Sequence, residues 1–291
     1  METRPNPTAS AGFMLLAAAL IAGTSLLAKM AGRDVLGDAL HPLQISHGRF
    51  LFAFLAIGTT ALILRPRIET PNLSVHFARS LAGWSGISLM FAAVAFIPMA
   101  DATAISFLNP VFAMILAIPL LGERVGPWRW TAAGIAVIGA MILIRPGAGT
   151  FQPAALLALS AALVMGFEIT LIKLLTGRER PLQILLINNA IGLAIATLAV
   201  LFVWAPPTAA QWGALITLGL MMATAQACFI QAMKRADASF AVPFSYATLI
   251  FVGLYDFAVF DVVPAGSSLA GAAIIIAGAA LMLWRESRAR R

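Results

Sequence analysis

The sequence predicts an all-α membrane protein of ten transmembrane helices, built as two inverted five-helix repeats. Of its 291 residues 61% are hydrophobic and 11% charged, whereas soluble proteins carry about a quarter charged residues. Its apolar runs are long and unbroken, as helices need in order to cross about 30 Å of hydrocarbon. The strands of a membrane barrel would instead be short and alternating. The third observation is an internal repeat.

Short stretches of the chain recur at a nearly constant offset. Three such pairs are residues 42–45 with 181–184, residues 100–103 with 236–239, and residues 139–140 with 278–279. The offsets of 139, 136 and 139 positions indicate two homologous halves, 1–147 and 148–291. In many secondary transporters, inverted repeats form the substrate site where the halves meet.

Each half contains five apolar spans, so the second half enters the membrane from the opposite side. The spans are the apolar runs between charged residues, prolines and glycines. A signal peptide at the first run is the alternative that we reject, because only Arg4 precedes it and the repeat requires it. The ten predicted spans are residues 11–31, 42–64, 76–98, 101–121, 128–145, 153–175, 181–204, 212–234, 238–259 and 265–284.

Positive charge predicts the orientation. With the N-terminus inside, fifteen of the 19 Lys and Arg residues fall in cytoplasmic segments, which is the usual bias of short loops. We therefore expect a multi-pass protein of the bacterial inner membrane with both termini cytoplasmic. The net charge of +7 lies in these short connections, so the lipid bilayer is the expected partner and nucleic acid is not.

Few residues are suited to metal binding or catalysis. A single cysteine, Cys228, excludes an internal disulfide framework and a cysteine-based metal cluster. The three histidines, His41, His47 and His76, form no metal-binding spacing. We expect no metal, no cofactor and no enzymatic activity, and an intramembrane enzyme is only a remote alternative.

Residues 100–141 resemble the EamA repeat of the drug/metabolite transporter superfamily, and residues 236–283 resemble its second copy. The resemblance is carried by Ala102, Asn109-Pro110, Gly122-Glu123, Gly134 and Gly139. It implies two inverted five-helix repeats that move small metabolites by alternating access, and the aromatic amino acid exporter branch is similar. The second copy departs from the pattern, with Tyr246 where the first has Pro110 and only Asp261 near the place of the Gly-Glu pair.

Prolines inside the repeat-related spans four and nine are candidate hinges. Pro110 and Pro243 each remove a backbone donor and free a carbonyl one turn earlier. Exposed backbone at membrane depth survives only when it is buried in protein or lines a wet cavity. We predict hinge roles, with a kink that merely improves packing as the alternative.

Polar residues within the spans are candidates for substrate binding. Glu168 lies deep in span six, where an ionised carboxylate costs about 2.5–3.5 kcal/mol. We expect it to face the cavity and bind a substrate amine or couple protons; the alternative is an ion pair with Lys173 at the headgroups. Asn109 and Gln226 lie centrally in spans four and eight. Their amides can bind a zwitterionic substrate or form a hydrogen bond between helices. For Asn188 and Asn189 we prefer the hydrogen bond between helices.

Span two contains two candidates for a gate or for proton coupling. Arg49 can hold a substrate carboxylate or extend to the outer headgroups. His47 changes charge near neutral pH, although a packed interhelical histidine is the alternative. Lys29 and Asp256 are expected at the outer rim.

Aromatic residues within spans predict an apolar or aromatic part of the cavity lining, with plain packing as the alternative. These residues are Trp84, Phe107, Phe229 and Tyr246. Tryptophans at span ends fit an interfacial belt. Gly134 with Gly139, and Gly271 with Gly278, are expected to let helices five and ten approach closely.

We therefore predict a secondary transporter that exports amino acids or related small metabolites by alternating access. Topology does not set the direction of transport, so an uptake carrier for a vitamin or nucleoside-like metabolite is the main alternative. The expected partners are a small-molecule substrate and the bilayer, and a monomer is sufficient for this reading.

Overall fold

The computed structural model describes residues 6–65, 71–122, 125–144, 153–176, 179, 181–233, 235 and 242–289. All regular structure within these residues is helical. The elements are α1 (Pro7–Ala31), α2 (Pro42–Leu64), α3 (Leu73–Phe96), α4 (Met99–Ser106), α5 (Asn109–Leu121), α6 (Pro127–Ile144), α7 (Ala154–Thr176), α8 (Pro181–Val200), α9 (Ala209–Met233), the 3₁₀ helix η1 (Val242–Tyr246), α11 (Ala247–Phe260) and α12 (Gly266–Ala289).

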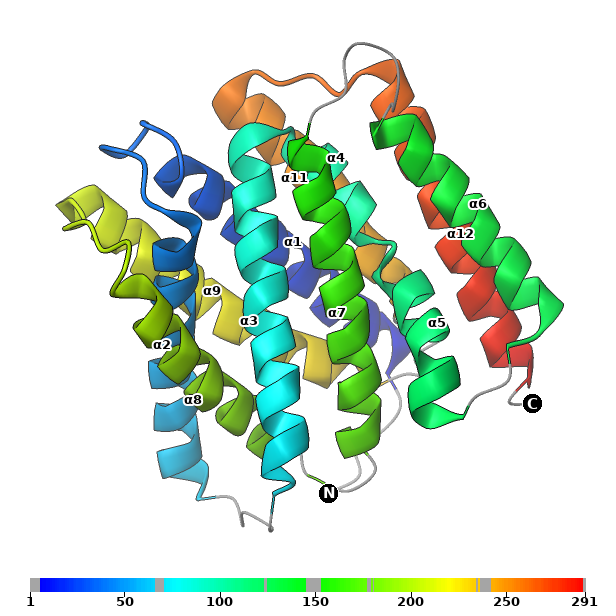
Figure 1. The fold of residues 1–291 in the computed structure, drawn as a ribbon, viewed down its shortest axis with the longest axis horizontal. Coiled ribbons are helices and arrows are strands. Elements are labelled where there is room, and N and C mark those ends of the chain that lie inside the picture. Colours follow the sequence, from blue (N-terminus) through cyan, green and yellow to red (C-terminus); the bar gives the residue numbers. More distant parts are fainter. Residues whose placement is uncertain are drawn as a thin grey trace.

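These elements confirm the ten predicted spans. Seven helical stretches in the described residues are long and apolar enough to cross a membrane, among them α4 and α5 taken together, and three shorter apolar stretches lie in α6, η1–α11 and α12. The beginning of α1 and the end of α12 lie at the same end of the bundle (Figure 1), which we call the terminal end. An even number of spans requires this arrangement.

The packing of the helices repeats with the roles of the two halves exchanged. Helix α1 packs against α9 and α11, and its counterpart α7 packs against α3 and α5. Helix α2 also packs against its own counterpart in the second repeat, α8, and α6 packs against its counterpart, α12. Since most of these contacts join the first half to the second, the structure has the seam that inverted repeats predict.

Helices α6 and α12 approach closely through glycine, as predicted. A Cβ atom on Gly139 would come within 2.7 Å of the Gly271 carbonyl oxygen, and one on Gly278 within 2.7 Å of the Ala132 carbonyl oxygen. Gly134 has no neighbour within 4 Å of such a Cβ atom, so it takes no part in this contact. The pair forms one side of the bundle (Figure 1).

Helix caps correct the alignment of the two repeats. Helix α5 ends at Gly122 with φ +67°, and α11 ends at Asp261 with φ +53°. Both residues are C-caps in the left-handed region, which glycine adopts freely and aspartate tolerates. They lie 139 positions apart, and at this offset Tyr246 corresponds to Phe107. The pairing of Tyr246 with Pro110 was therefore wrong.

Spans four and nine are discontinuous at corresponding places. Span four breaks at Phe107 and Leu108 between α4 and α5, and span nine changes from η1 to α11 after Tyr246. Pro110 lies in the first turn of α5, where its missing N–H has no helical partner to lose. Discontinuous helices at a repeat interface often mark a transporter's substrate site.

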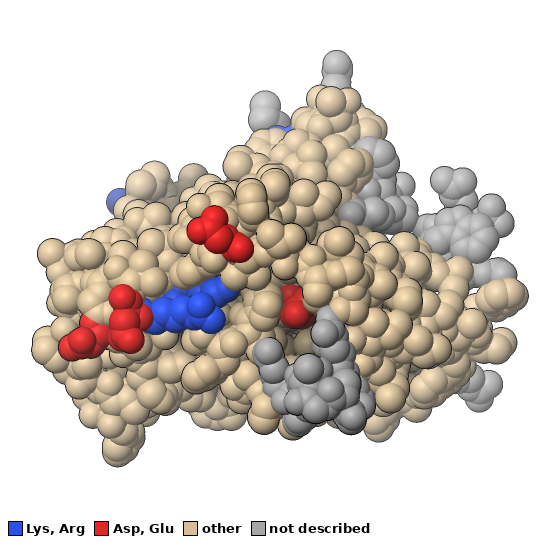
Figure 2. Space-filling model, turned by 90° about the horizontal axis from the view of Figure 1, so that it is seen from above, with Lys and Arg blue, Asp and Glu red and all other residues tan. Residues whose placement is uncertain are grey.

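Figure 2 shows the end of the bundle opposite the terminal end. This face is largely uncharged, with a short basic patch close to acidic groups. The described charged residues at this end are Arg33, Asp34, Asp38, Asp101 and Asp261. Because the charges at this end are few and of both signs, it presents no strongly charged binding surface. The candidate functional site lies within the seam.

Candidate functional site

The two helix discontinuities meet through an aromatic pair. The rings of Phe107 and Tyr246 have centroids 5.2 Å apart at an interplanar angle of 74°, an edge-to-face geometry that aromatic pairs favour. Phe107 lies at the break in span four, and Tyr246 ends η1 in the other half. The structure therefore joins two predicted site residues at the seam.

Nine buried side-chain polar atoms have no hydrogen-bond partner among the described residues, and three of them belong to uncharged residues on α3, α4 and α9. These three are Trp84 Nε1 on α3, Thr103 Oγ1 on α4 and Gln226 Oε1 on α9. A buried donor or acceptor without a partner costs about 1–3 kcal/mol. Such atoms are available to a ligand, and they include the predicted Trp84 and Gln226.

A charged cluster, formed by Arg49, Arg79 and Glu168, lies between α2, α3 and α7. Arg79 Nη2 is 3.7 Å from Glu168 Oε1, and Arg79 Nη1 donates to the Ile184 carbonyl on α8 at 3.2 Å. The carboxylate lies over Gly83, where a Cβ atom would come within 2.8 Å of Oε1. The Glu168 side chain is 18% exposed and that of Arg79 6%, so the carboxylate borders an accessible space.

Arg49 is buried within the protein, so the alternative of a guanidinium at the outer headgroups was wrong. Only 5% of its surface is exposed, and its guanidinium carbon lies 4.3 Å from the centroid of the Phe50 ring. Its Nε and Nη1 atoms have no hydrogen-bond partner among the described residues. Glu168 and Arg79 are the charged groups that act on it electrostatically.

Lys29 and Asp256 form a buried ion pair, which corrects their expected place at the outer rim. Their side chains are 1% and 2% exposed. Lys29 Nζ donates to Asp256 Oδ1, and the Met99 N–H donates to Oδ2 at 2.8 Å. The pair joins α1 and the start of α4, in the first half, to α11 in the second. The protein tolerates both buried charges because each one neutralises the other.

The remaining predicted residues lie apart from these contacts. His47 packs edge-on against Trp204, with ring centroids 6.4 Å apart. Asn109 begins α5, Pro243 lies within η1, and Phe229 on α9 is exposed. Their roles in binding, gating or hinge motion stay predictions.

A hydrogen-bonded group at the terminal end was missed from the sequence. His76 Nε2 lies 2.8 Å from Glu179 Oε2, Gln183 donates to the same oxygen at 2.8 Å, and the Asn72 N–H donates to Oε1 at 3.2 Å. Burial alone would raise the pKa of Glu179, but these hydrogen bonds together hold that pKa below its ordinary value. The group ties α3 of the first half to the α7–α8 connection of the second.

Arg79 was also missed, although the sequence held a signal. It was counted among the cytoplasmic charges that set the orientation, yet it falls inside the predicted span 76–98. An arginine within a span is costly and is therefore a functional candidate.

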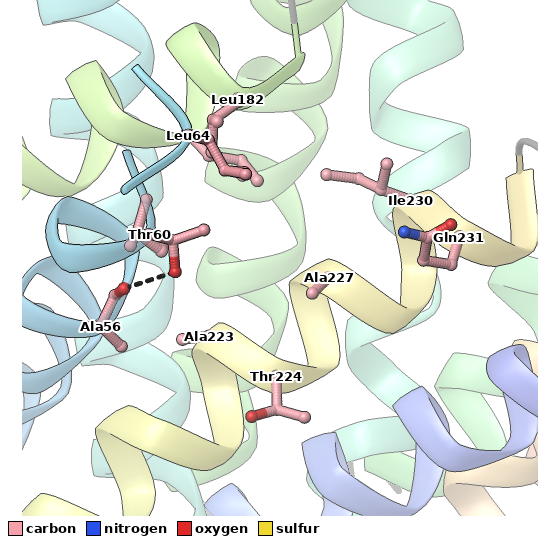
Figure 3. Close-up of a pocket in the computed structure, with 11 residues that line it drawn as sticks. Ala56, Thr60, Leu64, Leu182, Ala223, Thr224, Ala227, Ile230 and Gln231 are labelled. Atoms are coloured by element: carbon pink, nitrogen blue, oxygen red, sulfur yellow. Dashed lines mark hydrogen bonds between the residues drawn. The ribbon is translucent and has the colours of Figure 1, made fainter. Parts of the chain in front are cut away.

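A pocket of about 570 Å³ lies between α2, α8 and α9 (Figure 3). Its lining is mainly aliphatic, and Thr60 Oγ1 donates to the Ala56 carbonyl of its own helix at 2.8 Å. Leu64 in the lining is 65% exposed, so the pocket opens on the apolar outer surface. None of the predicted site residues lines it. The lining residues are Ala56, Ile57, Thr60, Leu64, Leu182, Leu185, Ala223, Thr224, Ala227, Ile230 and Gln231.

The sequence pattern of the EamA-like transporter family matches residues 9–145 and 152–284, once in each half. The chain belongs to the EamA-like transporter family. This EamA-like protein is therefore a membrane transporter rather than an enzyme, as expected, and its fold is the two-repeat fold of the family.

Relatives of this EamA-like chain include transporters named for riboflavin and for S-adenosylmethionine. A riboflavin transporter of Rhizobium johnstonii is 34% identical over 224 residues, which cover 74% of this chain and 72% of the relative. An S-adenosylmethionine uptake transporter of Rickettsia bellii is 25% identical over 255 residues, covering 87% and 88%. A solved structure described only as "Crystal structure of protein" has a TM-score of 0.64 at 22% identity, covering 99% of this chain and 100% of that one. That last likeness shows the fold alone.

Proposed function

We propose that the protein takes up a small metabolite with a heteroaromatic ring, such as a vitamin or nucleoside-like compound, across the bacterial inner membrane. The Phe107–Tyr246 pair at the two helix breaks carries this proposal, because aromatic side chains stack readily on flat rings. Rocking of the two halves about the seam opens the site to each side in turn. This is the uptake alternative from the sequence, now preferred over amino acid export.

Buried polar atoms on α3, α4 and α9 suit such a ring. The Trp84 indole N–H is a donor, the Gln226 carbonyl oxygen an acceptor and the Thr103 hydroxyl either, and all three lack partners among the described residues. Heteroaromatic rings present N–H, ring nitrogen and carbonyl groups at their edges. Small-molecule sites are typically apolar with a few polar atoms that fix orientation.

The names of the relatives support the same substrate class. Riboflavin and S-adenosylmethionine, named for the relatives in Rhizobium johnstonii and Rickettsia bellii, each contain a planar nitrogen heterocycle. The direction proposed here follows the second of these names. Glu168 and His47 are the groups proposed for proton coupling.

Amino acid export, including the aromatic branch of the family, is the second candidate. The observation that favours it is the charged cluster, in which Arg79 and Glu168 place opposite charges 3.7 Å apart. A zwitterion can present its carboxylate to Arg49 and its ammonium group to Glu168.

Transport by the purified full chain in proteoliposomes tests the proposal. Labelled riboflavin, S-adenosylmethionine and tryptophan are followed inward and outward under imposed pH gradients. We expect riboflavin or S-adenosylmethionine to enter faster than into protein-free vesicles. Movement of tryptophan alone supports the second candidate, and movement of none of the three contradicts both.

Variants of the aromatic pair locate the site. Removing one ring of such a pair costs about 0.5–1.5 kcal/mol beyond the lost area, so Phe107→Ala and Tyr246→Ala should lower uptake about tenfold. Phe202→Ala is the matched control, since Phe202 is 88% exposed beyond the end of α8. Equal uptake by all three variants would contradict the assignment of the site.

A further inference from the structure

Buried charge in the charged cluster is unbalanced. Arg49 and Arg79 are both buried and Glu168 is the carboxylate that acts on both. Arginine keeps its charge in proteins, and each uncompensated buried ion costs several kcal/mol. Among the described residues, the cluster therefore holds one positive charge more than its own carboxylate offsets.

Arg49 is the cation with more unused donors, since its Nε and Nη1 but only the Nε of Arg79 lack a partner among the described residues. Arg79 already contacts Glu168 and donates to the Ile184 carbonyl. Arg49 has one face of its guanidinium against Phe50, while Nε and Nη1 have no partner among the described residues. Ser46 lies three positions earlier on the same helix face, and its hydroxyl is buried and unpartnered as well.

The cluster is linked through α7 to the break in span four. A Cβ atom on Gly166 would come within 2.8 Å of the Asn109 carbonyl oxygen, at the start of α5. Two residues later on α7, Glu168 faces Gly83 of α3, directly beside Trp84. Helix α7 thus contacts both the start of α5 and the helix that carries Arg79.

We infer that the substrate carries an anionic group, a carboxylate or a phosphate, which binds Arg49 and balances the charged cluster. This inference rests on the proposed function, because it places the heteroaromatic substrate in the same seam. The Arg49 guanidinium donates to the anion, and the Ser46 hydroxyl donates beside it. Compounds with the same ring but without the anion bind more weakly.

The expected preference follows from the strength of the bonds involved. Hydrogen bonds to charged groups contribute about 1.5–3 kcal/mol, which corresponds to about 10- to 100-fold in affinity. Lysine at position 49 keeps the charge but loses the planar fork of donors. Arg49→Lys should therefore retain part of the preference, and Arg49→Gln none.

Matched probe pairs test this inference on the purified full chain in neutral detergent without lipid, so that headgroup phosphates cannot act as the anion. The pairs are riboflavin with flavin mononucleotide, and decarboxylated S-adenosylmethionine with S-adenosylmethionine. Ligand-dependent thermal shifts give the affinities, since a ligand that binds the folded state stabilises it. We expect the anionic member of at least one pair to bind the wild type at least about tenfold more tightly.

Variants decide whether Arg49 is responsible. Arg49→Gln should abolish the preference, whereas Arg65→Gln, exposed at the end of the same helix, should leave it unchanged. If Arg49→Gln does not fold, Arg49→Lys and Ser46→Ala provide the test. A reduced preference for the anionic probe in either of them supports the inference. A preference that survives in all three site variants overturns the inference.

The outcomes also separate this inference from the proposed function. Equal binding of both members of each pair overturns the inference that the substrate carries an anionic group. It does not contradict the proposed uptake of a heteroaromatic compound. Binding of none of the four probes overturns the proposed function, and the inference falls with it.

Discussion

Lys29 on α1 and Glu168 on the repeat-related helix α7 are both charges within the bundle. Lys29 has its own carboxylate in Asp256, whose second oxygen also accepts the Met99 N–H. Glu168 is instead shared between two guanidiniums, and Nε and Nη1 of Arg49 have no partner within the described part of the chain. Lys29 and Asp256 thus form a balanced structural pair across the seam, whereas the charged cluster across the same seam holds the unbalanced charge expected of a binding site.

Repeat-related positions show that the fold does not require the two arginines. The counterpart of Arg49 at the offset of 139 is Asn188, which accepts from the Ser80 hydroxyl at 3.2 Å. Helices α3 and α9 begin 136 positions apart, so the counterpart of Arg79 is Leu215, which lies against Gly48. Since a neutral amide and a leucine fill the same places, the guanidiniums point to function rather than packing.

Breaking the balanced pair should give the largest effect. Asp256→Asn leaves Lys29 buried without a counter-ion, which costs about 3–5 kcal/mol. Thermal unfolding of the purified chain should show a large fall in melting temperature. The double variant Lys29→Met with Asp256→Asn should recover most of it, and an unchanged melting temperature in the single variant would contradict a structural role.

Two glycines 136 positions apart sharpen the comparison. A Cβ atom on Gly219 would come within 3.0 Å of the Ala53 backbone nitrogen, so Gly219→Ala should destabilise the fold by about 1–3 kcal/mol through overpacking. On Gly83 the three nearest atoms all belong to the Glu168 carboxylate, which can move. Gly83→Ala should therefore cost less stability than Gly219→Ala but weaken substrate binding. Unfolding and binding are measured on both variants, and the reverse order would contradict the assignment.

A smaller effect is expected for Glu179 at the terminal end. Because its pKa is below the ordinary value in the folded protein, its carboxylate stabilises the fold above about pH 4.5. That contribution is lost as the pH falls through the lowered pKa. The melting temperatures of wild type and Glu179→Gln should differ at neutral pH and converge on acidification. Equal pH dependence in wild type and Glu179→Gln would contradict this role of the Glu179 hydrogen bonds.

Hydropathy and the repeat were sufficient to predict the ten spans and their inverted arrangement. The prolines Pro110 and Pro243 drew attention to spans four and nine, but they did not predict the break at Phe107 and Leu108. Gln226 and Glu168 were singled out because polar residues at membrane depth are unusual, and Trp84 because its ring suits an aromatic substrate.

The contacts between helices could not be predicted from the sequence. Most spans are apolar all round, so no polar stripe indicates how a helix is rotated. Lys29 and Asp256 are separated by 227 positions, and no local pattern relates them. Arg79 was read as a topological charge because the sequence does not show that it is buried against α7 and α8.

Arg49 supplies the most direct test of the contrast between balanced and unbalanced buried charge, through the thermal unfolding of Arg49→Gln without ligand. Removing a buried charge that lacks hydrogen-bond partners should leave the melting temperature unchanged or slightly raised, in contrast to Asp256→Asn. A fall as large as that of Asp256→Asn would show that Arg49 is a structural residue and would contradict the account.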